Sequence, residues 1–296
     1  MSGLARIVKH EADAVYVAAL GAADNQLAMT AARALDGTPD AAAALPALLG
    51  ALARFTQTDS DTARDPRTAL LERVGQLGSK AQAVELRPYL SDRDPRVAEL
   101  AAKILSDWTG EPHRASPALR RIDPVPDEQE LAGLDGAALR VHMKGLGVFD
   151  AVLIVDEAPL SCARVARLAA AGYYDGLTFH RVVPNFLIQG GSPGANEFAG
   201  HDRYMRDEVG RLSHHRGAMG ISTRGRDTGD AQFYVDTVDV PRLDHEYTVF
   251  AQVTRGMEVV DAVLEGAVIE KVEVVLGAYE IPRDGRRQAT TAHGTR

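Results

Sequence analysis

The sequence lacks the features on which several large classes of protein depend. It contains a single cysteine, Cys162, which excludes an internal disulfide and any zinc or iron–sulfur site built from several cysteines. Lys and Arg number 33 against 41 Asp and Glu, so the net charge of -8 leaves no basic excess for holding a phosphate backbone. No run of about 18 uncharged apolar residues is present either. We therefore expect neither a nucleic acid nor a membrane as a partner.

The first ten residues also lack a secretory signal. Charged and polar residues interrupt them before an apolar core could form. If Met1 is the true start of the protein, a cytoplasmic location is expected.

The composition is that of a globular protein, with 45% hydrophobic and 25% charged residues, and 296 residues predict about two domains. The aromatic residues divide the chain into two halves. Only four of them precede Gly110, whereas six of the seven Phe lie within 149–250.

The first half is rich in Ala and Leu at helical spacing. Within 41–58 the apolar residues recur at steps of three and four and form one stripe along a helix: Leu45, Leu48, Leu49, Leu52 and Phe55. The same spacing predicts helices over 68–77 and 96–108, which end near Gly78 and Gly110.

An Arg-Asp-Pro-Arg sequence occurs twice, at 64–67 and 93–96, each time before such a helix. Asp is a favoured N-cap and Pro a favoured first helical residue, so we predict that both helices begin in the same way. The repetition predicts stacked helix pairs over about 4–37, 40–78 and 79–110, and it resembles HEAT-type α-solenoid repeats. A plain helical bundle is the alternative. A solenoid would favour a protein partner, which the sequence does not name.

Four prolines among many charges mark 111–130 as a semi-rigid linker. We therefore divide the chain into a helical domain, 1–110, this linker, a second domain, 131–280, and a polar C-terminal tail, 281–296.

After the linker the apolar period changes to two. Residues 139–143 alternate as a half-buried strand does, and a Gly-Leu-Gly turn joins them to a hairpin partner over 148–154. Two helices are predicted, over 161–171 and 256–264. Further short strands are predicted over 178–183, 186–189, 216–222, 232–236, 249–253 and 269–276. This pattern indicates a closed β-barrel capped by helices.

Common catalytic motifs are absent from the second half. The segment 220–225 has the wrong spacing for a Gly-x-Ser-x-Gly elbow, His245 has no second histidine at the spacing of a zinc protease, and no Walker loop occurs. The adjacent His214 and His215 would face opposite sides of a strand, which disfavours a metal pair. Cys162 on an amphipathic helix is interpreted as a packed thiol. We expect no metal and no cofactor.

One segment carries unusual local chemistry, 173–191, which reads YYDGLTFHRVVPNFLIQGG. Strand alternation predicts that Phe179 and Arg181 share a face, and Phe186 and Gln189 follow after a Pro-Asn turn. An arginine, a phenylalanine and a glutamine on one wall describe an apolar pocket with a guanidinium donor. For Arg181 taken alone, a surface salt bridge is the alternative.

This segment closely resembles the Phe-His-Arg-x-x-x-x-Phe-x-x-Gln-Gly-Gly signature of cyclophilin-type peptidyl-prolyl cis-trans isomerases. The resemblance continues in the family's order through 229–235, 243–250 and 256–261, and it spans about residues 139–277. It implies the family's fold, a closed eight-stranded β-barrel with two capping helices. It also implies the family's activity, rotation about X–Pro bonds of polypeptide substrates without a cofactor.

The resemblance implies site residues position by position. Arg181 matches the catalytic arginine. The positions that match substrate-binding residues are Phe186, Leu187, Gln189, Ser222, Thr223, Gln232, Tyr234, Leu243 and Tyr247. Tyr234 replaces the family's usual Phe, and Tyr247 replaces a His of many eukaryotic members. Arg242 stands where those members carry Trp, which implies weak cyclosporin binding.

Two functions from different classes remain open at this point. The first is an active prolyl isomerase that assists protein folding, with the helical half recruiting clients. The alternative is a non-catalytic module that holds proline-containing segments on a helical scaffold. Arg181, Phe186 and Gln189 together favour the enzyme, whereas Ser222 and Tyr234 leave room for the binding module.

Overall fold

A computed structural model describes residues 1–118 and 124–277, which form two compact units. The first unit contains 1–118 together with 201–203, and the second contains 124–200 together with 204–277. Each unit has its own hydrophobic core. The predicted polar tail, 281–296, lies outside the described residues, as does part of the predicted linker.

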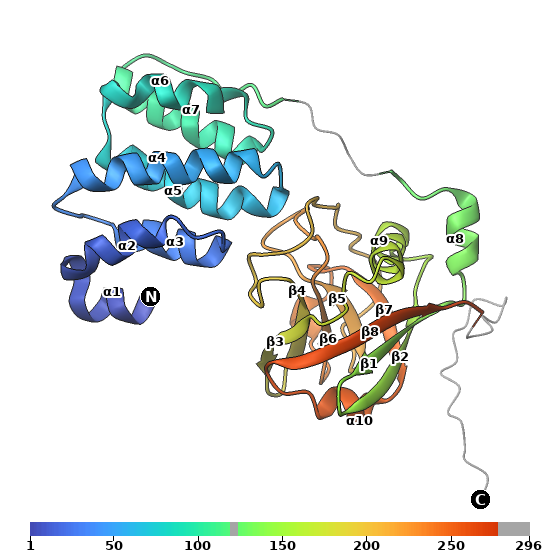
Figure 1. Ribbon diagram of the computed structural model, residues 1–296. Helices are drawn as coiled ribbons and strands as arrows, with labels where there is room; N and C mark the ends of the chain where they lie inside the picture. The colour runs from blue at the N-terminus through green and yellow to red at the C-terminus, as the bar shows by residue number, and fades with distance from the viewer. Residues whose placement is uncertain (119–123, 278–296) are drawn as a thin grey trace, which may run out of the picture. The chain divides into compact units, whose positions relative to one another are not determined.

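The first unit is all-α (Figure 1). Its α-helices are α1 (Ser2–Val8), α2 (Asp13–Ala19), α3 (Asn25–Ala34), α4 (Ala41–Gln57), α5 (Arg64–Leu77), α6 (Ala83–Leu86) and α7 (Pro95–Thr109). Helix α4 packs against α5, and α5 packs against both α3 and α7. The second helices of the pairs α2–α3, α4–α5 and α6–α7 therefore contact one another in series.

The two Arg-Asp-Pro-Arg sequences begin their helices differently, contrary to the prediction. Asp94 is the N-cap of α7, and its carboxylate accepts hydrogen bonds from two backbone N–H groups of the first turn at 2.9 and 3.4 Å. Helix α5 instead begins at Arg64, directly after a short 3-10 turn, so Asp65 lies inside the first turn and is not the cap. Pro66 is tolerated there because the N–H groups of a first turn have no partner within the helix.

The second unit contains a closed antiparallel barrel of eight strands (Figure 1). The strands are β1 (Ala138–Met143), β2 (Gly147–Leu153), β3 (Thr178–Val183), β4 (Leu187–Ser192), β5 (Ala218–Ile221), β6 (Phe233–Asp236), β7 (Val249–Arg255) and β8 (Ala267–Val275). Their order around the barrel is β1-β2-β7-β5-β6-β4-β3-β8. Every strand predicted from the sequence is present, and the predicted closed barrel is confirmed.

Three helices pack on this barrel: α8 (Glu128–Leu134), α9 (Pro159–Ala170) and α10 (Met257–Asp261). The buried residues of α9 and α10 belong to the barrel core, and the two helices lie at opposite ends of the barrel (Figure 1). Cys162 is buried in this core, where its thiol donates to the carbonyl oxygen of Phe250 at 3.2 Å. Helix α8 begins before the predicted end of the linker and packs against α9.

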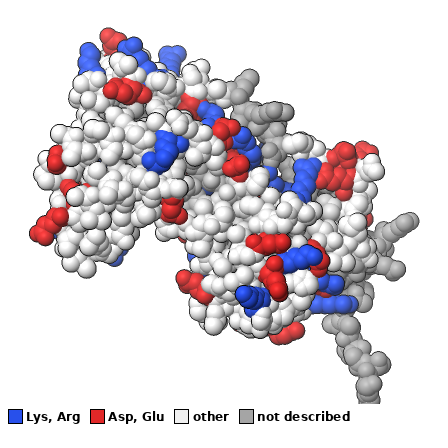
Figure 2. Space-filling view, viewed as in Figure 1, with Lys and Arg blue, Asp and Glu red and all other residues white. Residues whose placement is uncertain are grey.

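Charged side chains of both signs are interspersed among uncharged residues on the face shown in Figure 2. Such mixing accords with 33 basic and 41 acidic residues in one chain. Within 1–118 and 124–277, no helix is both long enough and apolar enough to cross a membrane.

Candidate active site

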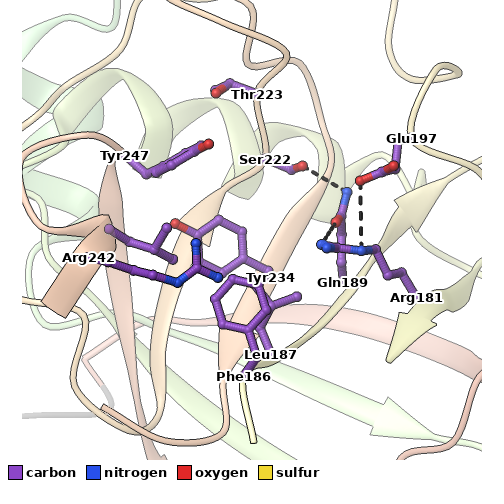
Figure 3. A pocket seen from close by; sticks show the side chains of 11 residues that line it. Arg181, Phe186, Leu187, Gln189, Glu197, Ser222, Thr223, Tyr234, Arg242 and Tyr247 are labelled. Atoms are coloured by element: carbon purple, nitrogen blue, oxygen red, sulfur yellow. Dashed lines mark hydrogen bonds and ion pairs between the residues drawn. The ribbon is translucent and has the colours of Figure 1, made fainter. Parts of the chain in front are cut away.

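A pocket of about 240 Å³ lies outside the barrel core, and Figure 3 shows the side chains around it. Strands β3, β4 and β6, the turn between β3 and β4, and the loops that follow β4, β5 and β6 supply its lining. The lining residues are Arg181, Phe186, Leu187, Gln189, Glu197, Ser222, Thr223, Tyr234, Arg242, Leu243 and Tyr247. The fold thus brings together every residue that the sequence analysis assigned to the site except Gln232.

A β-bulge on β3 decides where Arg181 points. His180 has no partner across the ladder, because Phe179 pairs with Gly190 and Arg181 pairs with Gln189. A bulge shifts the alternation of side chains by one residue. Phe179 is consequently buried in the barrel core, whereas Arg181 lines the pocket. The prediction that these two side chains share a face is therefore wrong, since strand alternation assumes an unbroken ladder.

The bulged residue, His180, is half-buried next to the pocket arginine. Burial lowers the pKa of His180 below its ordinary value, because it penalises the charged imidazolium, and the positive charge of Arg181 lowers this pKa further. Glu197 acts in the opposite direction, but its effect is smaller than that of burial. His180 is therefore neutral at neutral pH.

Hydrogen bonds organise the polar side of the pocket (Figure 3). Nη1 of Arg181 donates to Oε1 of Gln189 at 3.1 Å. The amide nitrogen of Gln189 in turn donates to Oγ of Ser222 at 2.8 Å and to Oε1 of Gln232 at 3.0 Å. Because both ends of this buried amide are bonded, the orientation of Gln189 is set, and the direction of the Arg181 guanidinium with it.

Gln232 lies behind Gln189 and is only 1% exposed. Its amide nitrogen donates to the backbone carbonyls of Asn196 at 3.2 Å and Ala199 at 2.7 Å, in the loop after β4. From this position Gln232 orients Gln189 and does not line the pocket. The sequence analysis had assigned it a direct contact with the substrate.

The opposite side of the pocket is an apolar cluster separate from the barrel core. Its members are Phe186, Leu187, Tyr234, Val238, Val240, Leu243 and Tyr247. The rings of Tyr234 and Tyr247 pack edge to face, with their centroids 6.3 Å apart. The Cζ atom of Arg242 lies 4.2 Å from the centroid of the Phe186 ring, and that of Arg181 lies 6.0 Å from it. Phe186 is thus within cation–π range of both guanidinium groups.

Tyr234 fits in this cluster because the residue opposite it on β5 is Gly220. A Cβ atom on Gly220 would lie 2.2 Å from Cζ of Tyr234 and 2.3 Å from its hydroxyl oxygen. Among the described residues this buried hydroxyl has no hydrogen-bond partner. Burial raises the pKa of Tyr234 well above its ordinary value, and the nearby carboxyl of Asp236 raises it further. The phenol therefore stays protonated.

The sequence analysis missed Glu197, whose Oε1 lies 3.8 Å from Nε of Arg181. The two side chains are 51% and 38% exposed, so water screens their ion pair. Glu197 lies in the loop after β4 and belongs to none of the motifs recognised in the sequence. No local signal distinguishes it from an ordinary surface acid, because only the folding of the loop brings it to Arg181.

The two adjacent histidines lie in the loop before β5, not on the strand that the sequence analysis assumed, and they differ in burial. His214 is buried, with Nδ1 2.8 Å from Oδ2 of Asp236, whereas His215 is exposed. Within the described ranges, no group of three or more His, Cys, Asp or Glu side chains is arranged to hold a metal ion.

Comparison with known proteins places the second unit in a broad group of similar sequences. Residues 138–279 match the family described as cyclophilin type peptidyl-prolyl cis-trans isomerase/CLD. A peptidyl-prolyl cis-trans isomerase of Helicobacter pylori is 36% identical over 159 residues, which cover 51% of this chain and 96% of the relative. Peptidyl-prolyl cis-trans isomerase B of Bacillus subtilis is 37% identical over 124 residues, 41% of this chain and 87% of the relative. Each match covers about half of this chain or less.

Proposed function

The chain belongs to the cyclophilin-type peptidyl-prolyl cis-trans isomerase family, and from that premise we propose that Arg181 is the catalytic residue of the pocket. The protein is an isomerase that acts on proline-containing polypeptides. The open question is how its own residues lower the barrier to rotation about the X–Pro bond.

The physical demand on the site is modest. Rotation about the X–Pro bond is opposed by a barrier of about 18–20 kcal/mol, because the C–N bond is partly double. Unaided exchange takes tens to hundreds of seconds. A turnover of about 1–10³ s⁻¹ therefore requires only about 3–7 kcal/mol of transition-state stabilisation. Preorganised electrostatics and shape are sufficient for an effect of this size.

Arg181 can supply the electrostatic part. As the amide twists, the prolyl nitrogen loses conjugation and gains a basic lone pair. A guanidinium directed at that lone pair stabilises the twisted state more than either planar isomer, which is the condition for catalysis. The hydrogen bond from Arg181 to the buried Gln189 supports this role, because the guanidinium is already oriented before the substrate binds.

The apolar side can supply the shape. We propose that the prolyl ring packs against Phe186, Leu187, Tyr234 and Leu243, which form one cluster on the side of the pocket opposite the polar network. Ser222, Thr223 and Tyr247 also line the pocket and would contact the flanking backbone. Gln232 is assigned a positioning role through Gln189.

The single observation that carries this proposal is the bulge that turns Arg181 out of the barrel and beside Gln189. Its test is a protease-coupled isomerisation assay on an Ala-Pro peptide with wild type, Arg181→Ala and Arg255→Ala. Arg255 is an exposed arginine on β7 that does not line the pocket, so it controls for the loss of one charge. We expect Arg181→Ala to lower kcat/KM by about 10²–10³-fold, as the loss of one preorganised donor does elsewhere. Equal rates for wild type and Arg181→Ala would refute the assignment.

For the helical unit we propose a recruiting role, in which HEAT-like helix pairs bring protein clients or partners to the isomerase. Helix pairs that contact one another in series, and the exposed apolar side chains of Ile7 and Val84, support this role. The Val84→Asp variant of the full chain tests it. Turnover of short peptides should be unchanged, whereas acceleration of a proline-limited protein refolding reaction should decrease. An unchanged refolding rate would contradict a recruiting surface on α6.

A further inference from the structure

The two arginines that line the pocket differ in how their charges are compensated. Arg181 is bonded to Gln189 at 3.1 Å and faces the carboxylate of Glu197 at 3.8 Å. Arg242 is exposed, and among the described residues no carboxylate oxygen lies within 4.0 Å of its guanidinium. Arg242 therefore brings an uncompensated positive charge to the pocket.

The aromatic ring of Phe186 contacts the guanidinium of Arg242 at the pocket. The guanidinium lies over Phe186, 4.2 Å from the ring centroid, and Figure 3 shows it on the side of the pocket away from Arg181. A cation–π contact does not use the guanidinium N–H groups as hydrogen-bond donors to a polar partner, so they remain able to donate. Those N–H groups match the two oxygens of a carboxylate.

The nearest acidic residue along the chain is already engaged elsewhere. The carboxylate of Asp244, two residues after Arg242, accepts a hydrogen bond from the backbone N–H of His214 at 2.7 Å. This hydrogen bond lowers the pKa of Asp244, so the group remains a bound anion. It is directed toward the backbone of His214, and among the described residues it forms no ion pair with Arg242.

We propose that Arg242 selects substrates in which an Asp or Glu flanks the target proline, on the side of the chain that faces Phe186. The inference rests on the proposed function, since it places the prolyl ring against Phe186. A carboxylate on the adjoining residue then comes within reach of the Arg242 edge. This preference opposes the overall charge of the chain, -8, which by itself disfavours anionic peptides.

The experiment compares kcat/KM for peptides that differ in one residue beside the proline, measured by NMR exchange so that no coupling protease adds its own preference. One series places Glu, Gln or Lys before the proline, and the other places the same residues after it. We expect the Glu/Gln ratio to be about 2–5 on one side and near 1 on the other, as for an exposed ion pair, and to fall as salt is added.

Variants of Arg242 show whether the ratio comes from this residue. Arg242→Gln should bring the Glu/Gln ratio to about 1, and Arg242→Glu should invert the preference in favour of Lys. Arg255→Gln, the matched loss of an exposed arginine outside the pocket, should keep the wild-type ratio. A wild-type ratio of 1 on both sides, or a ratio that survives in Arg242→Gln, would overturn the proposal. If instead wild type accelerates no peptide more than Arg181→Ala does, the proposed catalytic role of Arg181 fails. That result is distinct from a failure of the Arg242 proposal.

Discussion

The two sides of the pocket are built by different forces. On the polar side, Arg181 and Gln189 are held by a chain of hydrogen bonds that runs through the buried Gln232 to the backbone. On the apolar side, Phe186 and Tyr234 are held by packing, and the Tyr234 hydroxyl has no partner among the described residues. Hydrogen bonds fix direction, whereas packing fixes shape. The side that must direct a charge is the bonded side, and the side that must hold a ring is the packed side.

Among the variants that test this contrast, the largest effect is expected when the direction of the Arg181 group changes and its charge is kept. Arg181→Lys retains the cation but loses the planar group that bonds to Gln189. We expect kcat/KM for an Ala-Pro peptide to fall by about 10²-fold, with an unchanged midpoint of urea unfolding. Arg255→Lys is the control and should behave as wild type. Near-normal activity in Arg181→Lys would show that a positive charge alone suffices for catalysis. The hydrogen bonds on the polar side would then not be needed to orient the cation.

The second prediction concerns shape on the packed side. Gly220→Ala introduces a Cβ atom 2.2 Å from Cζ of Tyr234, so the ring or the strand must move. We expect a loss of about 1–3 kcal/mol in the free energy of unfolding, as for other overpacked sites. A double-mutant cycle with Tyr234→Ala should show a coupling energy of similar size, because the clash needs both partners. Additive effects in the cycle would contradict direct contact between residues 220 and 234.

The third prediction is a pH dependence on the bonded side. Burial lowers the pKa of His180, so the unfolded chain binds more protons than the folded one below pH about 6.5. The free energy of unfolding should therefore fall as the pH drops from about 6.5 through the lowered pKa of the folded state. Urea titrations at pH 7.5 and 5.5 measure this slope, which His180→Gln should reduce. Equal slopes in wild type and variant would show that other groups carry the dependence.

The smallest effect is expected for the unpartnered phenol. Tyr234→Phe removes a buried hydroxyl that makes no hydrogen bond within the described residues. The free energy of unfolding should rise by at most about 1 kcal/mol, because the cost of an unsatisfied polar group disappears. Thermal unfolding measures the change, with Tyr247→Phe as a matched loss of a tyrosine hydroxyl in the same cluster. A clear loss of stability in Tyr234→Phe would mean that the hydroxyl has a partner after all.

Much of the architecture could be predicted from the sequence. Period-two alternation and short β-rich segments predicted all eight strands, and apolar stripes at steps of three and four predicted the longer helices α4, α5, α7 and α9. The short helix α8 was missed, because it begins among the charges and prolines of the predicted linker. Of the two repeated helix starts, Asp94 caps its helix as predicted, whereas the turn before α5 displaces Asp65 from the cap. Identical local sequences thus start helices differently when the preceding residues differ.

The sequence by itself determined which chemistry this protein carries, because the Phe-His-Arg and Gln-Gly-Gly segment and the apolar periods are encoded by neighbouring residues. Only the tertiary structure decided how that chemistry is presented. The ladder between β3 and β4 placed the bulge at His180 and turned Arg181 away from Phe179. The folding of a loop brought Glu197 to Arg181, and pairing across β5 and β6 set Tyr234 over Gly220. These outcomes depend on strand register and on contacts between distant segments, which no local pattern records.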